Sequence, residues 1–230
     1  MISKKEEREN SVRQSKTKMI LDAAIEVFVQ LGYHATRLED IAEAAGFSKT
    51  ALYYYFKDKE EIFLNLCLRE HERLITEVGK NLSTCTCFID SLTTMIRTIF
   101  VEAGERFSFM LAFSNPDPGK AINPADFLKH QDTLSKFKQC RIDMERVFRK
   151  NVERGIQSGE INTPLPVEEI ANLIESLIKG IFMRWWQQGK KGDIEEEIKS
   201  IITFVRSGLN IKDVNCSSTT AVHSGETYEQ

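Results

Sequence analysis

The stretch LEDIAEAAGFSKTALYYYFK, residues 38–57, decides the fold. Its small, glycine and apolar positions have the spacing of two short helices that meet at a sharp turn. Ala42 lets the second helix cross closely over the first, and Gly46 adopts the turn conformation that a side chain would resist. Leu52 then packs the second helix into a small core, and Phe47 fills the turn. The spacing predicts a helix-turn-helix.

Signals on both sides of this stretch predict a helix before it and a helix after it. A helical stripe of apolar residues ends at Gly32, where the first helix can stop. Thr36 and Glu39 form a T-x-x-E capping box for the next helix, and Asp58 and Glu61 form a similar box for a longer one. The stripe before Gly32 consists of Ile20, Ala24, Val27, Phe28 and Leu31.

The remainder of the chain predicts longer helices and an all-α fold. Apolar residues recur at helical spacing near residues 88–105, 130–158, 167–185 and 194–209, and no region alternates like a strand. We therefore expect two domains between flexible ends. The expected division is a flexible N-terminal arm over 1–15, a helix-turn-helix domain over 16–62, a larger helical domain over 63–211 and a disordered tail over 212–230.

Composition points to an ordinary cytoplasmic protein. The net charge of −3 gives no global basic excess, so a nucleic-acid interface must depend on where the charges lie. The N-terminus lacks the apolar segment of a signal peptide, and no apolar run has the length of a membrane span. Five cysteines without a framework fit a reducing compartment. We expect no membrane partner.

The second helix of the motif predicts an outward aromatic face. With Leu52 set inward, Tyr54 points away from the core at about 100° per residue, and Thr50 shares its face. Tyr53 and Tyr55 fall on opposite flanks. A large aromatic facing outward on a short helix suits a recognition helix in the major groove of DNA. Lys49 and Lys59 add positive charge where the DNA backbone would pass.

Residues 17–67 resemble the N-terminal domain of the TetR family of bacterial transcriptional regulators. The resemblance rests on the patterns "AA…F…G…T" and "DIAEAAG.S…LYYYF..KE". It implies an N-terminal three-helix DNA-binding domain, a larger helical domain that binds ligand and dimerises, and double-stranded DNA as partner. By position, it implies base contacts from Lys49, Thr50 and Tyr54, and phosphate contacts from Tyr53, Tyr55, Lys59 and Thr36 or Arg37. Tyr55 stands where many relatives have histidine.

The larger domain is rich in apolar side chains, which suit either a simple core or a ligand pocket. A small-molecule effector of unknown identity is expected, and the irregular stretch 114–127 could gate its pocket. The candidate lining residues are Phe100, Phe107, Met110, Phe113, Phe137, Met144, Phe148, Phe182 and Trp185.

The last two helices are expected to form a homodimer interface. Asn172, Ser176 and Gly180 make a line of small residues along which another helix can approach closely. The other candidate interface residues are Ile174, Leu177, Ile181, Ile198, Ile202 and Val205. A single recognition helix reads few bases, so a two-fold dimer on a palindromic operator is expected.

The sequence thus predicts a DNA-binding transcriptional regulator, a repressor released from its operator by a small, largely apolar ligand. Two alternatives stay open. One is a helix-turn-helix regulator without an effector, controlled by a partner protein or acting as an activator. The other is a redox or metal sensor using Cys85 and Cys87. Catalytic motifs are absent, so we expect no catalytic site, no metal site and no cofactor.

Overall fold

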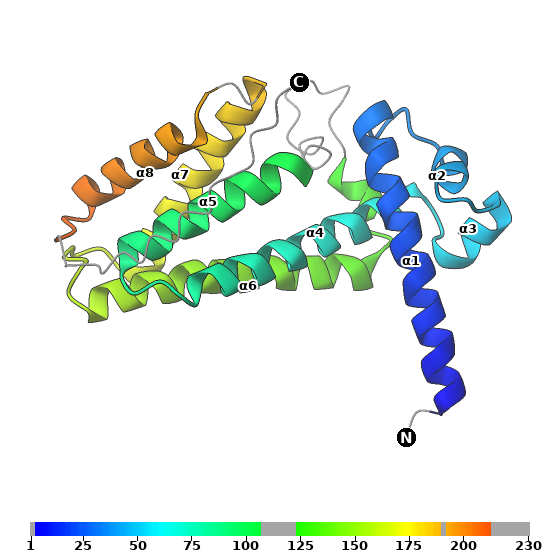
Figure 1. The fold of residues 1–230 in the computed structure, drawn as a ribbon, viewed down its shortest axis with the longest axis horizontal. Helices are drawn as coiled ribbons and strands as arrows, with labels where there is room; N and C mark the ends of the chain where they lie inside the picture. Colours follow the sequence, from blue (N-terminus) through cyan, green and yellow to red (C-terminus); the bar gives the residue numbers. More distant parts are fainter. Residues whose placement is uncertain (1–2, 107–122, 190–191, 213–230) are drawn as a thin grey trace.

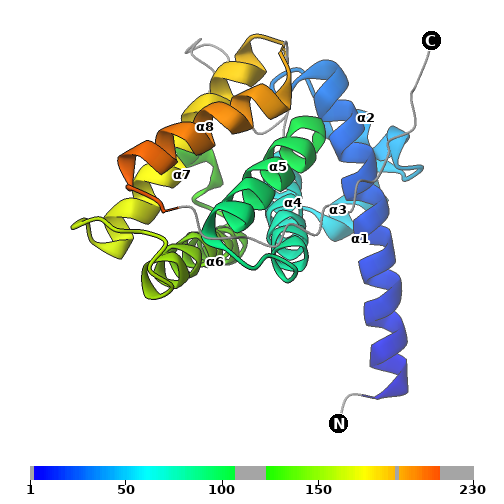
Figure 2. The same cartoon turned by 60° about the vertical axis from the view of Figure 1, so that its left-hand side comes forward.

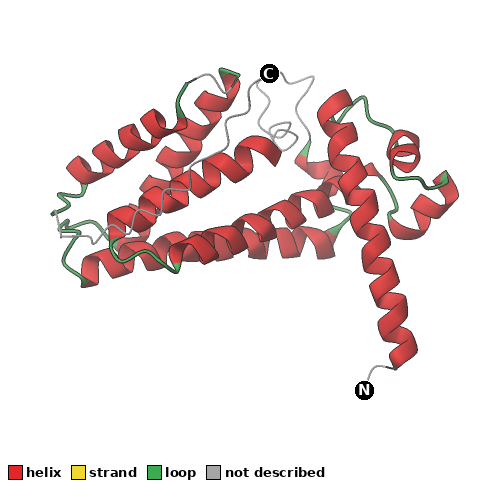
Figure 3. Ribbon diagram, viewed as in Figure 1, coloured by secondary structure: helices red, strands yellow, loops and turns green. Residues whose placement is uncertain are grey.

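The computed structural model describes residues 3–106, 123–189 and 192–212 (Figure 1). Within these ranges the regular structure is helical and no strand occurs (Figure 3), which confirms the all-α class. The elements are α1 (Lys4–Leu31), α2 (Leu38–Ala44), α3 (Lys49–Tyr55), α4 (Lys59–Leu82), α5 (Phe88–Arg106), the 3-10 helix η2 (Pro124–Phe127), α6 (Gln131–Gln157), α7 (Val167–Gln187) and α8 (Ile194–Gly208). No helix in this part of the chain is long and apolar enough to cross a bilayer. The expected tail lies outside the described residues, apart from Lys212.

The N-terminal half of α1 differs from the flexible arm expected over residues 1–15. The helix begins at Lys4 because Ser3 and Glu6 form a capping box. The Ser3 hydroxyl accepts the Glu6 N–H at 3.2 Å, and the Glu6 carboxylate accepts the Ser3 N–H at 2.7 Å. The arm also consists largely of good helix formers. Figures 1 and 2 both show this half of α1 projecting from the body of the molecule.

The predicted turn between α2 and α3 is confirmed. Ala42 and Leu52 are buried, and Gly46 has φ +73°, a conformation that favours glycine. The Ser48 hydroxyl caps α3 by accepting the Ala51 N–H at 3.2 Å. The helix-turn-helix is therefore fixed by local contacts that the sequence already indicates.

The capping box expected at Thr36 and Glu39 is one residue out of register. Arg37 is the N-cap of α2, and its backbone N–H donates to the Asp40 carboxylate at 2.7 Å. The Thr36 hydroxyl instead donates to the carbonyl of Gly32 at 2.7 Å. Thr36 thereby closes the turn that ends α1 and does not start α2.

Helix α4 joins two separate hydrophobic cores. Its first half, including Phe63 and Leu66, packs with α1, α2 and α3. Its second half, including Leu74 and Val78, packs in a second core with α5, α6, α7 and α8. A single continuous helix therefore crosses the boundary expected near residue 62.

A second connection joins the two cores at the start of α6. Phe127 of η2 is buried against Phe63 and Tyr33 in the first core, at ring-centroid distances of 6.0 and 6.4 Å. His130 Nε2 lies 2.8 Å from Asp58 Oδ1, and Lys129 Nζ lies 3.0 Å from Asp58 Oδ2. Because Asp58 is the N-cap of α4, this contact ties the beginnings of α4 and α6 together.

Candidate nucleic-acid interface

The recognition helix α3 has a buried face and an exposed face, as the spacing of its residues predicts. Leu52 and Phe56, which caps its C-terminus, are 1% and 4% exposed and face the first core. Tyr54 is 69% exposed and Tyr53 47% exposed, and Thr50 is also on the surface. An exposed tyrosine of this kind carries both a flat apolar ring and a hydroxyl that can donate a hydrogen bond. The outward face of α3 thus presents groups suited to base edges and phosphates.

Tyr55 has a different environment from the two tyrosines before it. It is half-buried and packs against the first core. Its ring meets Phe47 edge-on at 5.8 Å and Tyr54 edge-on at 5.1 Å. Such aromatic pairs stabilise beyond simple burial. Tyr55 therefore packs between the first core and the ring of Tyr54.

Lys49 lies at the start of α3 in contact with α2. Its ammonium forms an ion pair with Glu39, and Nζ lies 6.0 Å from the Tyr53 ring centroid. The hydrogen bond that Lys49 donates to Glu39 raises the pKa of Lys49, so the lysine stays charged. Exposed ion pairs contribute little to stability because water screens them. Lys49 can therefore exchange Glu39 for a DNA phosphate at little cost.

The structure gives Lys59 a role inside the protein. Its ammonium donates to the carbonyls of Tyr33 at 2.8 Å, Thr36 at 2.9 Å and His34 at 3.4 Å. It also lies 4.5 Å from the Tyr33 ring centroid, and burial lowers its pKa. These carbonyls belong to the turn between α1 and α2. Lys59 thus holds that turn, in contrast to the phosphate contact expected from its position.

The two candidates for a phosphate contact at the start of α2 differ in exposure. Thr36 is 2% exposed, so its side chain is closed to DNA, contrary to expectation. Arg37 is exposed at the N-cap of the helix. Of this pair, only Arg37 retains a side chain that a phosphate can approach.

Two cations of α1, absent from the expected site, lie beside the recognition helix. Arg13 Cζ is 5.9 Å from the Tyr54 ring centroid, and Lys16 Nζ is 5.3 Å from that of Phe47. Both come from the segment around the start of the expected domain, which is helical in the structure. The S-x-x-E pattern at Ser3 and Glu6 is the sequence signal that would have extended the helix far enough to place them.

The ligand-pocket candidates fall into three groups. Met144, Phe148 and Phe182 line a cavity of about 170 Å³ between α4, α5, α6 and α7. Phe100 and Trp185 are buried behind Phe182 in the second core, and Phe137 packs edge-on against His71 at 4.8 Å. Phe107, Met110 and Phe113 lie outside the described residues. The structure therefore brings three of the candidates together at one cavity.

The candidate dimer residues include several that the protomer buries itself. Ile174, Ile198 and Val205 are 4%, 3% and 4% exposed, so they cannot add contact area to a second subunit. Their assignment was wrong because one wide apolar stripe serves both the protomer's own core and its surface. Asn172, Ser176 and Gly180 are exposed as expected, whereas Leu177, Ile181 and Ile202 are half-buried.

Two large apolar side chains on this face were missed. Leu173 is 55% exposed and Phe204 67% exposed. They flank a shallow apolar groove of about 120 Å³ between α7 and α8, which Leu165, Leu177 and Leu209 help to line. Phe204 lies one residue before Val205, so correct phasing of α8 against its own core would have identified it.

The four described cysteines lie in different surroundings. Cys85 is a half-exposed free thiol that contacts Thr94 Oγ1 at 3.5 Å, whereas Cys87 is buried. Burial raises the pKa of the Cys67 thiol, and it raises that of Cys140 to about 11, so both stay protonated at neutral pH. Within the described ranges, no group of three or more His, Cys, Asp or Glu side chains is placed to hold a metal ion.

Comparison with known proteins agrees with the geometry of α2 and α3. Residues 20–66 match the model of the family described as bacterial regulatory proteins, tetR family. The N-terminal domain of the chain is a TetR-family DNA-binding domain. The chain is a DNA-binding transcriptional regulator whose relatives are regulators of the same kind.

Individual relatives differ in identity and in how much of this chain they match. The transcriptional regulator RutR of Escherichia coli K12 is 56% identical over 50 residues, which are 22% of this chain and 24% of that protein. The transcriptional repressor AcnR of Corynebacterium glutamicum is 25% identical over 197 residues, 84% of this chain and 92% of that protein. The crystal structure of FadR from Bacillus subtilis with stearoyl-CoA has a TM-score of 0.68 at 24% identity, covering 83% of this chain and 98% of that one. The last similarity shows a shared fold.

Proposed function

We propose that this TetR-family regulator is a homodimeric cytoplasmic repressor that binds a palindromic operator through α3. It leaves the operator when a ligand with a long apolar part enters the cavity between α4, α5, α6 and α7. The repressor AcnR, similar over most of its length, supports the sign of regulation. The observation that carries the proposal is that α4 forms a wall of this cavity and also begins inside the DNA-binding domain.

The cavity has an apolar interior and a polar rim. Leu74, Ile99, Met144, Phe148, Ile178 and Phe182 supply apolar walls, and His71, Arg141, Glu175 and Lys179 supply polar groups. Its volume of about 170 Å³ is below the roughly 300 Å³ at which ordinary ligand sites begin. A ligand of ordinary size therefore has to part the helices, so binding and movement of α4 are coupled.

The route from the cavity to the DNA is short and continuous. Leu74 lies at the cavity, and Lys59 at the other end of α4 holds the turn before α2. The Asp58–His130 contact adds the start of α6 to the same junction. A shift of α4 changes the separation of the two recognition helices in a dimer. The dimer then no longer matches successive major grooves, and DNA affinity falls.

The rim favours a ligand with a negative end. Arg141 and Lys179 lie beside an apolar interior, and each has only a carboxylate on its own helix as ion-pair partner among the described residues. The Arg141–Glu145 pair is exposed on both sides, so it is weak and Arg141 can exchange it for a ligand anion. The structurally similar FadR was crystallised with stearoyl-CoA. We therefore propose long-chain acyl compounds with an anionic head as the ligand class.

The dimer contact would use the exposed face of α7 and α8. A two-fold axis places Phe204 of each protomer against the apolar groove of the other, so each exposed ring is covered. The line of Asn172, Ser176 and Gly180 lets the helices approach closely, since Gly180 has open space around its Cβ position. A second copy of the chain is the occupant that supplies matching apolar surface.

The proposal is tested by ligand release from DNA. A duplex selected by the protein from a randomised pool is labelled, and its affinity is measured with stearoyl-CoA or with free CoA. Stearoyl-CoA should weaken binding at least about fivefold, in the usual range of allosteric coupling, and free CoA should not. Met144→Trp, which fills the cavity, should bind the duplex but lose the response. Ile142→Trp, at a 45% exposed position of the same helix, is the matched control.

The alternatives give different results in this experiment. If acyl-CoA compounds of every chain length leave DNA affinity unchanged, the ligand class is wrong. If Met144→Trp responds like the unmodified protein, the cavity is not the effector site. A regulator controlled by a partner protein would bind the duplex normally and respond to none of these ligands.

A further inference from the structure

We propose that α1 extends the DNA-binding surface beyond the recognition helix, and that Arg13 contacts the sugar-phosphate backbone of the bound DNA. This inference rests on DNA binding through α3. It concerns a helix that lies outside the helix-turn-helix itself.

Arg13 and the recognition helix lie on one surface of the protein. The Arg13 guanidinium carbon lies 5.9 Å from the ring centroid of Tyr54, and both side chains are exposed. Lys16 lies one turn further along α1, with Nζ 5.3 Å from the ring of Phe47 in the turn before α3. A duplex that touches Tyr54 therefore comes within reach of a long side chain on α1.

Charge balance leaves Arg13 and Lys16 available to an anion, unlike Lys49 and Lys59. Lys49 is paired with Glu39, and Lys59 is bound to backbone carbonyls. Within the described part of the chain, Arg13 and Lys16 form no ion pair with a carboxylate. Contact of an uncompensated cation with DNA releases a counterion without breaking an existing pair. These two side chains thus offer a large electrostatic gain on binding.

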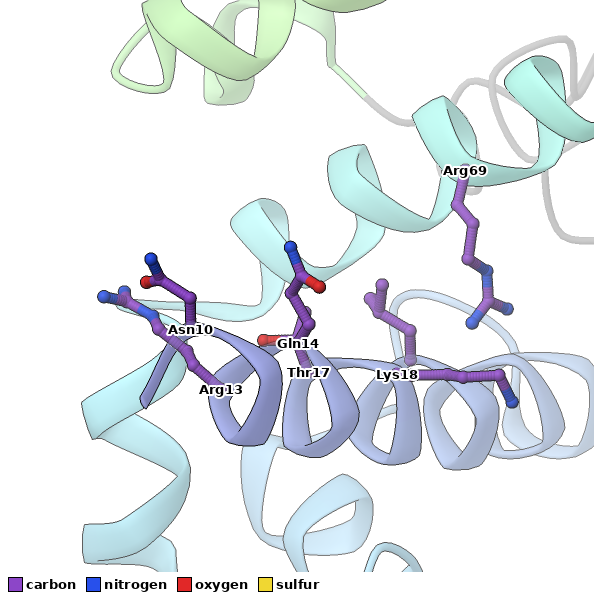
Figure 4. A pocket seen from close by; sticks show the side chains of 7 residues that line it. Asn10, Arg13, Gln14, Thr17, Lys18 and Arg69 are labelled. Atoms are coloured by element: carbon purple, nitrogen blue, oxygen red, sulfur yellow. The ribbon is translucent and has the colours of Figure 1, made fainter. Parts of the chain in front are cut away.

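The groove that contains Arg13 has no acidic wall. It lies between α1 and α4, has a volume of about 340 Å³ and is lined by Asn10, Arg13, Gln14, Thr17, Lys18, Leu21 and Arg69. Figure 4 shows Asn10 and Arg13 at one end, with Lys18 and Arg69 toward the other. Amide, hydroxyl and guanidinium groups are the usual donors to phosphate oxygens.

The two ends of this groove differ in net charge. Lys18 and Arg69 both bind the carboxylate of Asp22, each at 2.7 Å, so that end is partly neutralised. The Arg13 end, next to Tyr54, keeps its positive charge. A polyanion that follows the surface from α3 is therefore drawn to Arg13, with Asn10 and Gln14 as neighbouring hydrogen-bond donors. The geometry points to the DNA backbone as the occupant.

The test compares Arg13→Gln with Arg8→Gln. Both changes remove one exposed positive charge from α1, but Arg8 lies about 140° around the helix from Arg13. Affinities are measured from 50 to 300 mM salt, roughly a Debye length of 14 to 6 Å, for a duplex selected from a randomised pool and for a mixed-sequence duplex of equal length. Arg13→Gln should weaken both roughly fivefold and lower the salt slope by about 0.9, whereas Arg8→Gln should change either less than about twofold.

Each other outcome overturns a defined part of the inference. Equal effects of the two variants, or an unchanged slope for Arg13→Gln, would remove Arg13 from the interface. Weakening of the selected duplex alone would make Arg13 a base contact and overturn the backbone assignment. Thermal melting should be the same for both variants, because both side chains are exposed. If the unmodified protein selects no sequence, DNA binding itself fails, a result distinguishable from failure of Arg13 alone.

Discussion

The recognition helix α3 and the helix pair α7–α8 both expose large side chains, but their surroundings differ. Tyr53 and Tyr54 have cationic neighbours, Lys49 over one ring and Arg13 over the other. Phe204 and Leu173 border an apolar groove lined by aliphatic side chains. The first surface suits a polyanion, whereas the second suits another apolar surface. The charge of the neighbouring side chains thus indicates which kind of partner each surface would suit.

Relatives of this chain differ in identity and in the share of the chain that they match. The 50 residues that match RutR at 56% identity cover only 22% of this chain, whereas AcnR is 25% identical over 84% of it. The family model covers residues 20–66, so the part of the chain that carries α2 and α3 is the part it shares with that family.

The largest effect is expected from Phe204→Glu, which places a charge in the apolar face of α7–α8. Two glutamates would meet near the two-fold axis, and like charges at an interface cost several kcal/mol. The dimer dissociation constant should rise roughly 100-fold or more, since each 1.4 kcal/mol is a factor of ten. Sedimentation velocity measures it directly. Val101→Glu, at a 45% exposed position of α5, should leave the dimer intact.

A dimer unaffected by Phe204→Glu would contradict the assignment of the α7–α8 face to a second subunit. The exposed ring would then belong to a different partner, and the α7–α8 face would no longer be the dimer interface. Loss of the dimer together with loss of helicity would instead indicate that the variant does not fold. Phe204→Ser, which removes apolar area without adding charge, separates these cases by weakening the dimer less.

The next largest effects are expected at Tyr54 and Tyr55 of α3, on DNA binding for the first and on stability for the second. Tyr54→Ala should leave stability unchanged and weaken operator binding by about 1–3 kcal/mol with relaxed sequence preference, because the ring is exposed beside the DNA. Tyr55→Ala should lower the free energy of unfolding by about 1–2 kcal/mol, because its ring packs on Phe47 and the first core. Urea unfolding and anisotropy with selected and mixed-sequence duplexes measure both. If Tyr54→Ala proves the less stable variant, the assignment of the two rings is reversed.

Local contacts explain why the helix-turn-helix could be predicted. Ala42, Gly46, Ser48 and Leu52 act on partners a few residues away, so their spacing alone fixes the turn and the outward face of α3. The one-residue error in the predicted N-cap at Thr36 also arises from local contacts. Two possible caps lie one residue apart, and the choice depends on the bond from Thr36 to Gly32 and from Arg37 to Asp40.

Long-range contacts explain what the sequence did not reveal. Lys59 looks like a surface charge beside the recognition helix, but its three acceptors are 23 to 26 residues earlier in the chain. Ile174 and Leu173 are both apolar neighbours on α7, and only the packing of the protomer shows that one is buried and the other exposed. Periodicity predicts an apolar face but does not divide it between core and partner.

Substitution of Lys59 and of Lys57 distinguishes a structural lysine from an exposed one near α3. Lys59→Met removes an ammonium that binds three carbonyls, so it should destabilise the protein by about 1–2 kcal/mol, allowing for its partial exposure. Lys57→Met removes an exposed charge two residues away and should leave stability within about 0.5 kcal/mol. Urea unfolding of both variants measures the difference. A salt slope for DNA binding that falls with Lys59→Met, without loss of stability, would return Lys59 to the phosphate contacts.

The smallest effect is expected at the junction of α4 and α6. Burial by itself would raise the pKa of Asp58, but the Glu61 N–H, Lys129 and His130 outweigh it and hold the pKa below its ordinary value. A carboxylate with a depressed folded-state pKa stabilises the protein above its unfolded pKa of about 3.9, and this stabilisation is lost as the pH falls through the folded value. Asp58→Asn keeps an N-cap acceptor but removes the charge, so it isolates this contribution.

Asp58→Asn should therefore cost about 1 kcal/mol at pH 6, and the gap to the unmodified protein should close as the pH falls below about 4. Urea unfolding between pH 6 and pH 3 measures the gap. Asp193→Asn is the matched control, because Asp193 also caps a helix but forms no ion pair within the described residues. A gap that stays constant with pH would mean that Asp58 acts only as a cap. The contact with His130 would then contribute no electrostatic link between the start of α4 and the start of α6.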